Sequence, residues 1–348
     1  MLEKIVNAMI AVAVCTAGGF VFTLLDAPLP WMLGALTAAA ISAISGRRWF
    51  IPSQGRAFGR PMVGLLAGCA FTAEVLAAAL GWWDAVLLVL VQGFVVTLLG
   101  YVFLRKVGGY DRQTAFYAGA PGGMSEMALM GASLGGDVRT IVVSHTLRIV
   151  VVLFSIPFIL QMVVGHDFGR IIPSSMAETP PDAFDWAVLA LCGIAGYGLA
   201  RLTPKFPAGS MIYPLIFSAC VHATGVTQAL PPQWLVAAVQ VILGGILGSR
   251  FAGIRWREMG PTVLVTGWWA ICMVMLAAAS AFVGTLLIDK QFASLILALA
   301  PGGTVEMTIL TFSLGADVAF VATCQIVRIL FVFIITPFLF GAIAPGRE

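Results

Sequence analysis

Residues 120–127 read APGGMSEM, and residues 300–307 read APGGTVEM. The same offset of 180 residues continues without a gap to Arg148 and Arg328, which both lie deep in long apolar segments. An internal repeat of this length organises a whole fold, so we expect two homologous halves. Pro-Gly-Gly interrupts an apolar segment in each half, and a continuous helix does not tolerate this tripeptide. The motif therefore predicts a duplicated chain with one broken helix per half.

The composition is that of a membrane protein. Of 348 residues, 60% are hydrophobic and only 10% are charged, whereas an average soluble domain has roughly 25% charged residues. Apolar stretches run well past the ~18 residues that indicate a transmembrane helix. No segment shows the ~10-residue alternation of a transmembrane β-strand. The sequence predicts an all-α polytopic membrane protein and excludes a soluble enzyme, a disordered chain and a DNA-binding protein.

The repeat divides the chain into a first membrane repeat (1–170), a polar, Pro-rich linker (171–183) and a second membrane repeat (184–348). Each repeat is predicted to have five apolar helices and one interrupted element. The helices are expected near 5–25, 29–45, 60–80, 83–104 and 138–164, and near 185–201, 208–224, 233–250, 262–288 and 318–341. The interrupted elements are 111–135 and 291–315. Irregular backbone at membrane depth must be buried in protein or line a wet cavity, so each is a broken span or a re-entrant hairpin.

The distribution of basic residues distinguishes a broken span from a re-entrant hairpin, because Lys and Arg accumulate on the cytoplasmic side of a membrane. If both interrupted elements are re-entrant, the chain crosses ten times and the second repeat is inverted. With the N-terminus inside, only Arg170 and Lys290 then fall outside, whereas full crossings place several more basic residues there. The distribution favours an inverted arrangement of five plus five helices, with both termini cytoplasmic.

Inverted repeats with broken helices are typical of secondary transporters, which bind substrate near the midplane at half-helix ends. A helix that begins at Gly122-Gly123 or at Gly302-Gly303 presents unpaired N–H groups and the positive end of its dipole. Two such ends that meet from opposite faces would form an anion site. The alternative is that each Pro-Gly-Gly only ends a helix and lets backbones pack closely.

The charged residues inside the apolar segments also indicate a site at the Pro-Gly-Gly breaks. An isolated charge costs roughly 2.5–3.5 kcal/mol inside a membrane and requires a partner, so we expect each deep Arg to pair with the Glu of a hairpin. Such a pair is either a structural link, or a site where Glu takes up a proton or cation and Arg neutralises an anionic substrate. The predicted substrate-binding residues are Gly122, Gly123, Ser125, Glu126, Arg148, Gly302, Gly303, Thr304, Glu306 and Arg328.

Coupling to H+ or Na+ is predicted to involve Glu126, Glu306 and His145. His145 can change charge near neutral pH, but Gln325 stands in the matching place, which favours plain hydrogen bonding. The three histidines and six cysteines are scattered along the chain. Metal sites need clusters of such ligands, so the sequence predicts no metal, no cofactor and no catalytic residue.

Two further pairs have structural interpretations. Asp137 and Asp317 directly precede the last helix of each half, where Asp is a strong N-cap. The pairs Trp82-Trp83 and Trp268-Trp269 are typical of anchors at the membrane interface. We therefore assign none of these residues to a ligand.

The repeated Ala-Pro-Gly-Gly-x-x-Glu-Met, with Leu-Gly-x-Asp-Val and Arg-Ile downstream, resembles the AbrB-type family of duplicated membrane proteins over essentially the full length. Members of this family have carried the labels "ammonia monooxygenase" and "regulator of gene expression". The resemblance implies a multi-pass protein of a bacterial-type inner (plasma) membrane, and it brings no set of catalytic residues. One departure is that Tyr213-Pro214 stands where the first half has Leu33-Gly34, so the second helices of the two repeats need not behave alike.

The sequence favours a secondary transporter of a small anionic or carboxylated solute, coupled to H+ or Na+. A monooxygenase would need clustered His and carboxylate ligands, so we expect no enzyme. A regulator of gene expression would act indirectly, because the predicted cytoplasmic loops are too short for a DNA-binding domain. The expected partners are the solute, the coupling ion and the lipid bilayer, without nucleic acid; a homo-oligomer is compatible with this interpretation.

Overall fold

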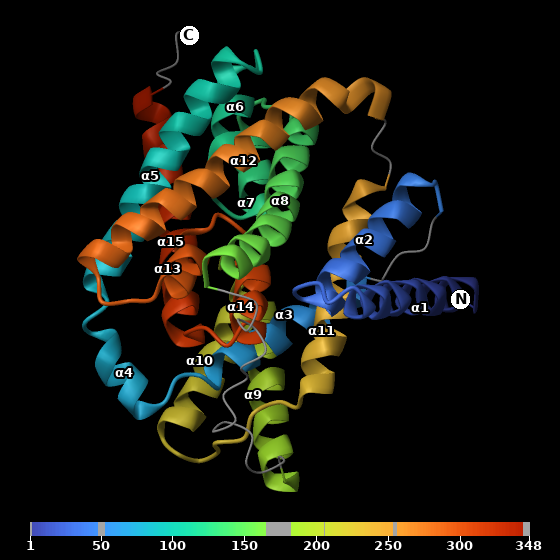
Figure 1. The fold of residues 1–348 in the computed structure, drawn as a ribbon, viewed down its shortest axis with the longest axis vertical. Helices are drawn as coiled ribbons and strands as arrows, with labels where there is room; N and C mark the ends of the chain where they lie inside the picture. The colour runs from blue at the N-terminus through green and yellow to red at the C-terminus, as the bar shows by residue number, and fades with distance from the viewer. Residues whose placement is uncertain (1, 48–52, 165–181, 205, 253–255, 344–348) are drawn as a thin grey trace. The chain divides into compact units, whose positions relative to one another are not determined.

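The computed structural model describes residues 2–47, 53–164, 182–204, 206–252 and 256–343 (Figure 1). Within these ranges the chain is helical and has no β-strand. Seven helices of the described part are long and apolar enough to cross a membrane. The prediction of an all-α polytopic membrane protein is therefore confirmed.

The helices follow the same order in both halves of the chain. Those of the first half are α1 (Leu2–Leu24), α2 (Pro30–Ile44), α3 (Ser53–Gly68), α4 (Ala73–Ala79), α5 (Trp83–Lys106), α6 (Arg112–Gly119), α7 (Met124–Ser133) and α8 (Val138–Val164). Those of the second half are α9 (Ala183–Leu202), α10 (Gly209–Ala223), α11 (Gln233–Gly248), the short 3₁₀ helix η2 (Ser249–Phe251), α12 (Trp256–Leu287), α13 (Phe292–Leu299), α14 (Thr304–Ser313) and α15 (Val318–Ile343). The predicted linker (171–183) lies outside the described residues except for its last two positions.

The number of crossings stays a prediction. Helices α2 and α10 have 15 residues each, which gives a length of about 22 Å against a hydrocarbon core of about 30 Å. Helices α3 and α4 pass as a span only when they are taken together. The ten predicted crossings therefore comprise seven long helices, two short ones and one bent pair.

The bent pair corrects the prediction of one continuous helix over 60–80. Helix α3 ends at Gly68, and α4 follows at an angle of 87°. The Thr72 hydroxyl accepts a hydrogen bond from the N–H of Val75 at 3.3 Å, as an N-cap does at the start of a new helix. Gly68 itself leaves no room for a side chain, because the Leu215 carbonyl and Ser218 lie against it. A tight glycine contact followed by an N-cap thus breaks this apolar segment.

The described helices form two compact units that do not coincide with the sequence halves. The first unit draws on 1–79, 160–255 and 308–319, and the second on 80–159, 256–307 and 320–348. Each unit thus contains helices from both halves.

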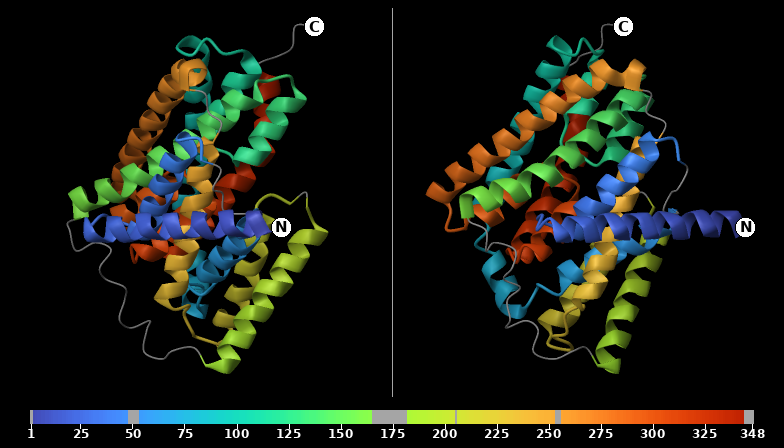
Figure 2. Two further views of the ribbon diagram at one scale, coloured as in Figure 1. Left: turned by 90° about the vertical axis from the view of Figure 1, so that its right-hand side faces the viewer. Right: turned by 45° about the vertical axis from the view of Figure 1, so that its right-hand side comes forward.

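The first compact unit is held by close helix contacts at glycines. Gly64 and Gly68 of α3 lie against main-chain atoms of α10, and Gly244 and Gly248 of α11 lie against main-chain atoms of α2. Small residues four apart let helix backbones approach in this way. Helix α1 crosses α2 and contacts α11 (Figures 1 and 2). The glycines of the two contact sets are related by the offset of 180 residues, and the main-chain carbonyls that they meet are related by one of 179.

The second compact unit contains the whole of the first interrupted element and residues 291–307 of the second. Gly100 of α5 and Gly119 of α6 leave no room for a Cβ between them, and α13 packs on α12. An aromatic group of Phe116, Tyr117 and Phe340 closes the core around α6, with ring centroids 5.2–5.5 Å apart. These contacts hold the first half-helices of both interrupted elements inside the unit.

Only one member of each tryptophan pair fits the predicted role of an anchor at the membrane interface. Trp83 and Trp268 are 70% and 62% exposed, which fits an interfacial anchor, but Trp82 and Trp269 are 7% and 3% exposed. Trp82 packs edge to face with Phe320. Neighbouring residues on a helix point about 100° apart, so one member of each pair turns into the core. The interpretation of Trp82 and Trp269 as anchors was therefore wrong.

Candidate functional site

The first interrupted element is a hairpin. Helix α6 is capped by Asp111, whose carboxylate accepts from the N–H of Thr114 at 2.7 Å. After α7 the chain returns to the same place, where the N–H of Asp137 donates to Oγ1 of Thr114 at 2.7 Å and Gly136 lies against Gln113. The half-helices of 8 and 10 residues rise only about 12 and 15 Å. The element enters and leaves at one end, so residues 111–135 form a hairpin, and its re-entrant placement in the membrane stays a prediction.

Arg148 of α8 lies against the break of this hairpin. Its Nη1 donates to the carbonyl oxygen of Ala120 at 3.1 Å, and its Nη2 donates to that of Gly122 at 3.0 Å. The side chain is 3% exposed. The planar guanidinium therefore spans the Pro-Gly-Gly turn and fixes its main chain from one side.

Arg328 of α15 makes the corresponding contacts in the second half. Its Nη1 donates to Ala300 at 2.7 Å and to Leu299 at 3.4 Å, and its Nη2 donates to Gly302 at 3.4 Å. A further bond joins Nη2 to Oε1 of Gln325. The acceptors at 300 and 302 are those of the first half shifted by 180 residues, so the repeat of the sequence extends to these contacts.

The neighbouring polar side chains on α8 and α15 serve the same helix ends. Nε2 of His145 donates to the carbonyl of Tyr117 at 2.9 Å, since a carbonyl can only accept, and Ser144 donates to Ala118 at 2.9 Å. Nε2 of Gln325 donates to Leu297 at 2.7 Å. Both side chains thus bond to main-chain carbonyls at a helix end, and a proton role for His145 stays a prediction. Ser144 was missed, because a single serine in an apolar helix carries no distinctive signal.

Helix physics explains why these donors are needed. The last four carbonyl groups of a helix have no partner within it, and its C-terminal end carries a partial negative charge. Helices α6 and α13 end inside the second compact unit, where Ala120 and Ala300 are fully buried. Arginine offers five N–H donors together with a positive charge. Each deep arginine thus acts as a cap for the C-terminus of a half-helix.

The predicted Glu–Arg pairs are not formed. Glu126, Glu306 and both arginines lie in the described part of the chain, and there each guanidinium takes main-chain oxygens in place of a carboxylate. The carboxylates instead fold back onto the glycines that precede their own helices. A Cβ at Gly123 would overlap Oε2 of Glu126, and one at Gly303 would overlap Oε2 of Glu306.

This fold-back also follows from helix physics. Gly123 is the N-cap of α7 and has no side chain that could accept from the first turn. The N-terminus of a helix carries a partial positive charge, and a Glu at the third position often reaches back to it. The same spacing separates Gly303 from Glu306. A carboxylate therefore already lies at each predicted anion-binding tip.

The remaining predicted residues lie around these tips. Gly122 and Gly302 are buried against the side chains of Met127 and Met307. Ser125 is exposed, whereas Thr304 is 7% exposed. The glycines at 122 and 302 thus face a methionine, and only those at 123 and 303 face a carboxylate.

Contacts within the second compact unit bring residues of the two halves together. Cδ1 of Ile329 on α15 lies 3.5 Å from the position of a Cβ at Gly123. Arg148 lies within electrostatic range of Arg328 and of Glu306. Nε of each arginine and Nδ1 of His145 are buried and make no hydrogen bond within the described residues. Each guanidinium therefore keeps one donor that its own helix end does not use.

Two other interpretations concern this region. The carboxylate of Asp137 accepts from the N–H of Arg139 at 3.0 Å and from the hydroxyl of Thr140 at 2.6 Å, so its predicted N-cap role is confirmed. Across the described ranges, no group of three His, Cys, Asp or Glu side chains is placed to hold a metal ion.

An all-α fold with seven apolar helices long enough to cross a membrane defines a polytopic membrane protein, and in it two interrupted helices each contact a buried arginine. The family model described as "Transition state regulatory protein AbrB" matches residues 31–344. The chain belongs to this AbrB family, as its motifs indicated.

Two relatives extend this finding. "Uncharacterized protein YhjN" of Bacillus subtilis (strain 168) is 26% identical over 357 residues, which cover 96% of this chain and 92% of the relative. "Putative regulator AbrB" of Escherichia coli (strain K12) is 20% identical over 319 residues, which cover 91% and 90%. The similarity extends over nearly the whole length of all three chains.

Proposed function

We propose that this protein is a secondary transporter of a small carboxylated anion, coupled to H+ or Na+, with its site at the two Pro-Gly-Gly tips. The observation that carries the proposal is the carboxylate of Glu126 or Glu306 against the glycine of each tip. A helix N-terminus that accepts its own carboxylate has the dipole and geometry to accept that of a ligand. The two carboxylates thus stand in for the substrate.

The arginines define the other side of the proposed site. Their Nη atoms hold the tips through main-chain carbonyls. Their unused Nε donors and positive charges remain for the anion. The electrostatic proximity of Arg148 to both Arg328 and Glu306 supports one shared site over two separate ones.

Coupling follows from competition for the same position. A substrate carboxylate that binds at Gly123 would displace the carboxylate of Glu126. Glu126 would then lose the stabilisation that it receives from the positive N-terminal end of α7. An unpaired carboxylate in a low-dielectric site is costly unless it gains a proton or a cation. Substrate binding would therefore favour uptake of H+ or Na+ by Glu126 and Glu306.

The first test is uptake of radiolabelled mono- and dicarboxylates into proteoliposomes, with and without pH and Na+ gradients. We expect gradient-driven accumulation of at least one carboxylate, and the gradient that drives it identifies the ion. Glu126→Gln should still exchange substrate across the membrane but lose gradient-driven accumulation. Failure of every carboxylate to accumulate in liposomes with active, folded protein would refute the proposal.

The second test places the substrate at the tips. Gly123→Ala and Gly303→Ala should push the flexible Glu carboxylate aside and crowd the ligand, so both should weaken binding more than they lower thermal stability. The matched control is Gly198→Ala, because no atom lies within 4 Å of a Cβ at that position. Wild-type affinity in both tip variants would leave the Pro-Gly-Gly breaks as packing devices.

The descriptions of the family and of the Escherichia coli relative favour a second function, an effect on gene expression. In a helical membrane protein we infer that such an effect is indirect and follows from the transported solute. A reporter gene measured in cells that carry Glu126→Gln separates the two cases. Loss of the regulatory effect together with transport supports the indirect route, and a normal effect without transport contradicts it.

A further inference from the structure

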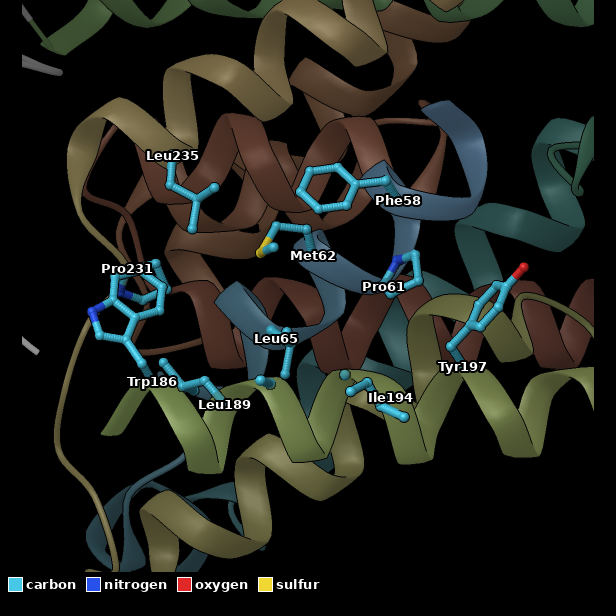
Figure 3. Close-up of a pocket in the computed structure, with 12 residues that line it drawn as sticks. Phe58, Pro61, Met62, Leu65, Trp186, Leu189, Ile194, Tyr197, Pro231 and Leu235 are labelled. Carbon is cyan, nitrogen blue, oxygen red and sulfur yellow. The ribbon is translucent and has the colours of Figure 1, made fainter. Parts of the chain in front are cut away.

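The first compact unit contains an apolar cavity whose lining includes none of the Pro-Gly-Gly residues. Helices α3, α9 and α11 enclose a volume of about 340 Å³ (Figure 3). Met62 of α3, Leu189 of α9 and Leu235 of α11 are among the side chains that line it. Two of its lining side chains, Ile194 and Phe58, are 71% and 46% exposed.

Water is a poor occupant of this cavity. A buried water needs two to four polar partners, and apolar cavities of such size stay dry. The lining side chains offer only the indole nitrogen of Trp186 and the hydroxyl of Tyr197. The volume lies at the low end of the range that binds small ligands, about 300–1,000 Å³. An apolar group is therefore the occupant that the lining fits.

The shape of the cavity favours a chain over a compact molecule. Figure 3 shows Trp186 and Tyr197 at opposite ends of a row of apolar side chains along α9. Eleven residues of helix separate them, which corresponds to about 16 Å. One leaflet of a bilayer has a hydrocarbon thickness of about 15 Å, half of the full core. The groove therefore has the length of a single lipid acyl chain.

One end of the groove carries a positive charge. Nε and Nη2 of Arg201 donate to the hydroxyl of Tyr197 at 3.1 and 3.0 Å, and the guanidinium lies 5.3 Å from the centre of that ring. Arg201 is exposed, near the C-terminal end of α9. Arginine has five N–H donors, so several remain for an anion. A phosphate at this end would meet both the guanidinium and the tyrosine hydroxyl.

We propose that this groove binds an anionic glycerophospholipid, with one acyl chain between α3 and α9 and the phosphate at Arg201 and Tyr197. Basic residues at the ends of membrane helices attract anionic headgroups in this way. Because Ile194 and Phe58 of the lining are exposed, the acyl chain would enter the groove from the bilayer past these side chains. The lipid thereby fills the space between α9 and α3 that side chains leave empty.

The test is native mass spectrometry of the purified full-length protein with phosphatidylglycerol or phosphatidylcholine. Wild type should retain phosphatidylglycerol in preference to phosphatidylcholine. Ala190→Phe fills the groove and should abolish retention, whereas Ala195→Phe, an exposed position of α9 outside the lining, should not. Arg201→Gln should weaken phosphatidylglycerol binding about fivefold and leave phosphatidylcholine unchanged.

A second measurement needs no variant. Phosphatidylglycerol with a photoreactive diazirine in its acyl chain should crosslink wild type at peptides from α3 and α9. Crosslinks confined to other helices, retention of the lipid by Ala190→Phe, or equal binding of both lipids would each overturn the proposal. A neutral apolar molecule found in place of the lipid would do the same.

Discussion

Arg148→Met removes the hydrogen bond to Ala120, the C-cap of α6, at 3.1 Å and the bond to Gly122 in the break at 3.0 Å. Hydrogen bonds from a charged group contribute about 1.5–3 kcal/mol each, so their loss amounts to about 3–6 kcal/mol. Removal of a buried cation returns part of its desolvation cost, which favours the lower end of that range. We expect Arg148→Met to lower the free energy of unfolding by about 3 kcal/mol, a large share of a typical 5–15 kcal/mol.

Two variants separate the geometric part of this effect from the charge. Arg148→Lys keeps the charge but lacks the planar fork that reaches Ala120 and Gly122 together, so it should lose about one bond, or 1.5–3 kcal/mol. Arg105 also donates to a carbonyl, that of Tyr110 at 2.8 Å, but it is exposed. Water can replace that bond, and Arg105→Met should stay within about 0.5 kcal/mol of wild type.

The measurement is reversible unfolding by SDS in mixed micelles, followed by circular dichroism. An Arg148→Met protein as stable as Arg105→Met would refute the capping role. Transport by the folded Arg148→Lys protein then tests whether Arg148 also binds the substrate. Normal transport would assign Arg148 to the support of the hairpin alone, and a loss without a matching loss of stability would assign it to the anion.

Three further predictions concern other elements. His145→Gln should preserve stability and transport, because a glutamine serves the matching helix end in the second half, and loss of proton-driven transport would instead assign a proton role to His145. Gly64→Ala should lower the thermal unfolding temperature, because its methyl meets a main-chain carbonyl that cannot give way, whereas Gly198→Ala meets nothing and should be neutral or stabilising by about 0.5–1 kcal/mol. Cysteines placed at Ser174 and Arg201 should label from opposite sides of the membrane, and labelling from one side would contradict the inverted arrangement.

Much of the candidate site could be predicted from the sequence. Helix breaks and charges cost free energy in an apolar segment, so they are rare there and easily recognised. Pro-Gly-Gly cannot continue a helix, so the ends of α6 and α13 could be predicted from the amino-acid sequence alone. The depth of Arg148 in its apolar segment required a partner inside the protein. These arguments use only local rules, and the structure agrees with both.

The identity of the partners could not be predicted in the same way. Pairing by opposite charge predicted a hairpin glutamate as the partner of each deep arginine, whereas Arg148 bonds to the main-chain carbonyls at the break. Which of several nearby acceptors an arginine bonds depends on the direction in which the main-chain carbonyls point. The spacing of residues in the sequence does not give that direction. The break after Gly68 was missed for a related reason, since its cause is a contact with Leu215 and Ser218, about 150 residues away.

Each Pro-Gly-Gly break exposes two opposite helix ends within four residues, and the four deep charges divide between them. The negative C-terminal end receives an arginine, which makes two or more bonds to main-chain oxygens in each half. The positive N-terminal end receives a glutamate through one flexible side chain. A ligand anion would have to break several bonds to displace Arg148 or Arg328, but only one contact to displace Glu126 or Glu306. In the proposed site, the arginine side of each break would therefore be the fixed half, and the glutamate side would be the half that exchanges when an anion binds.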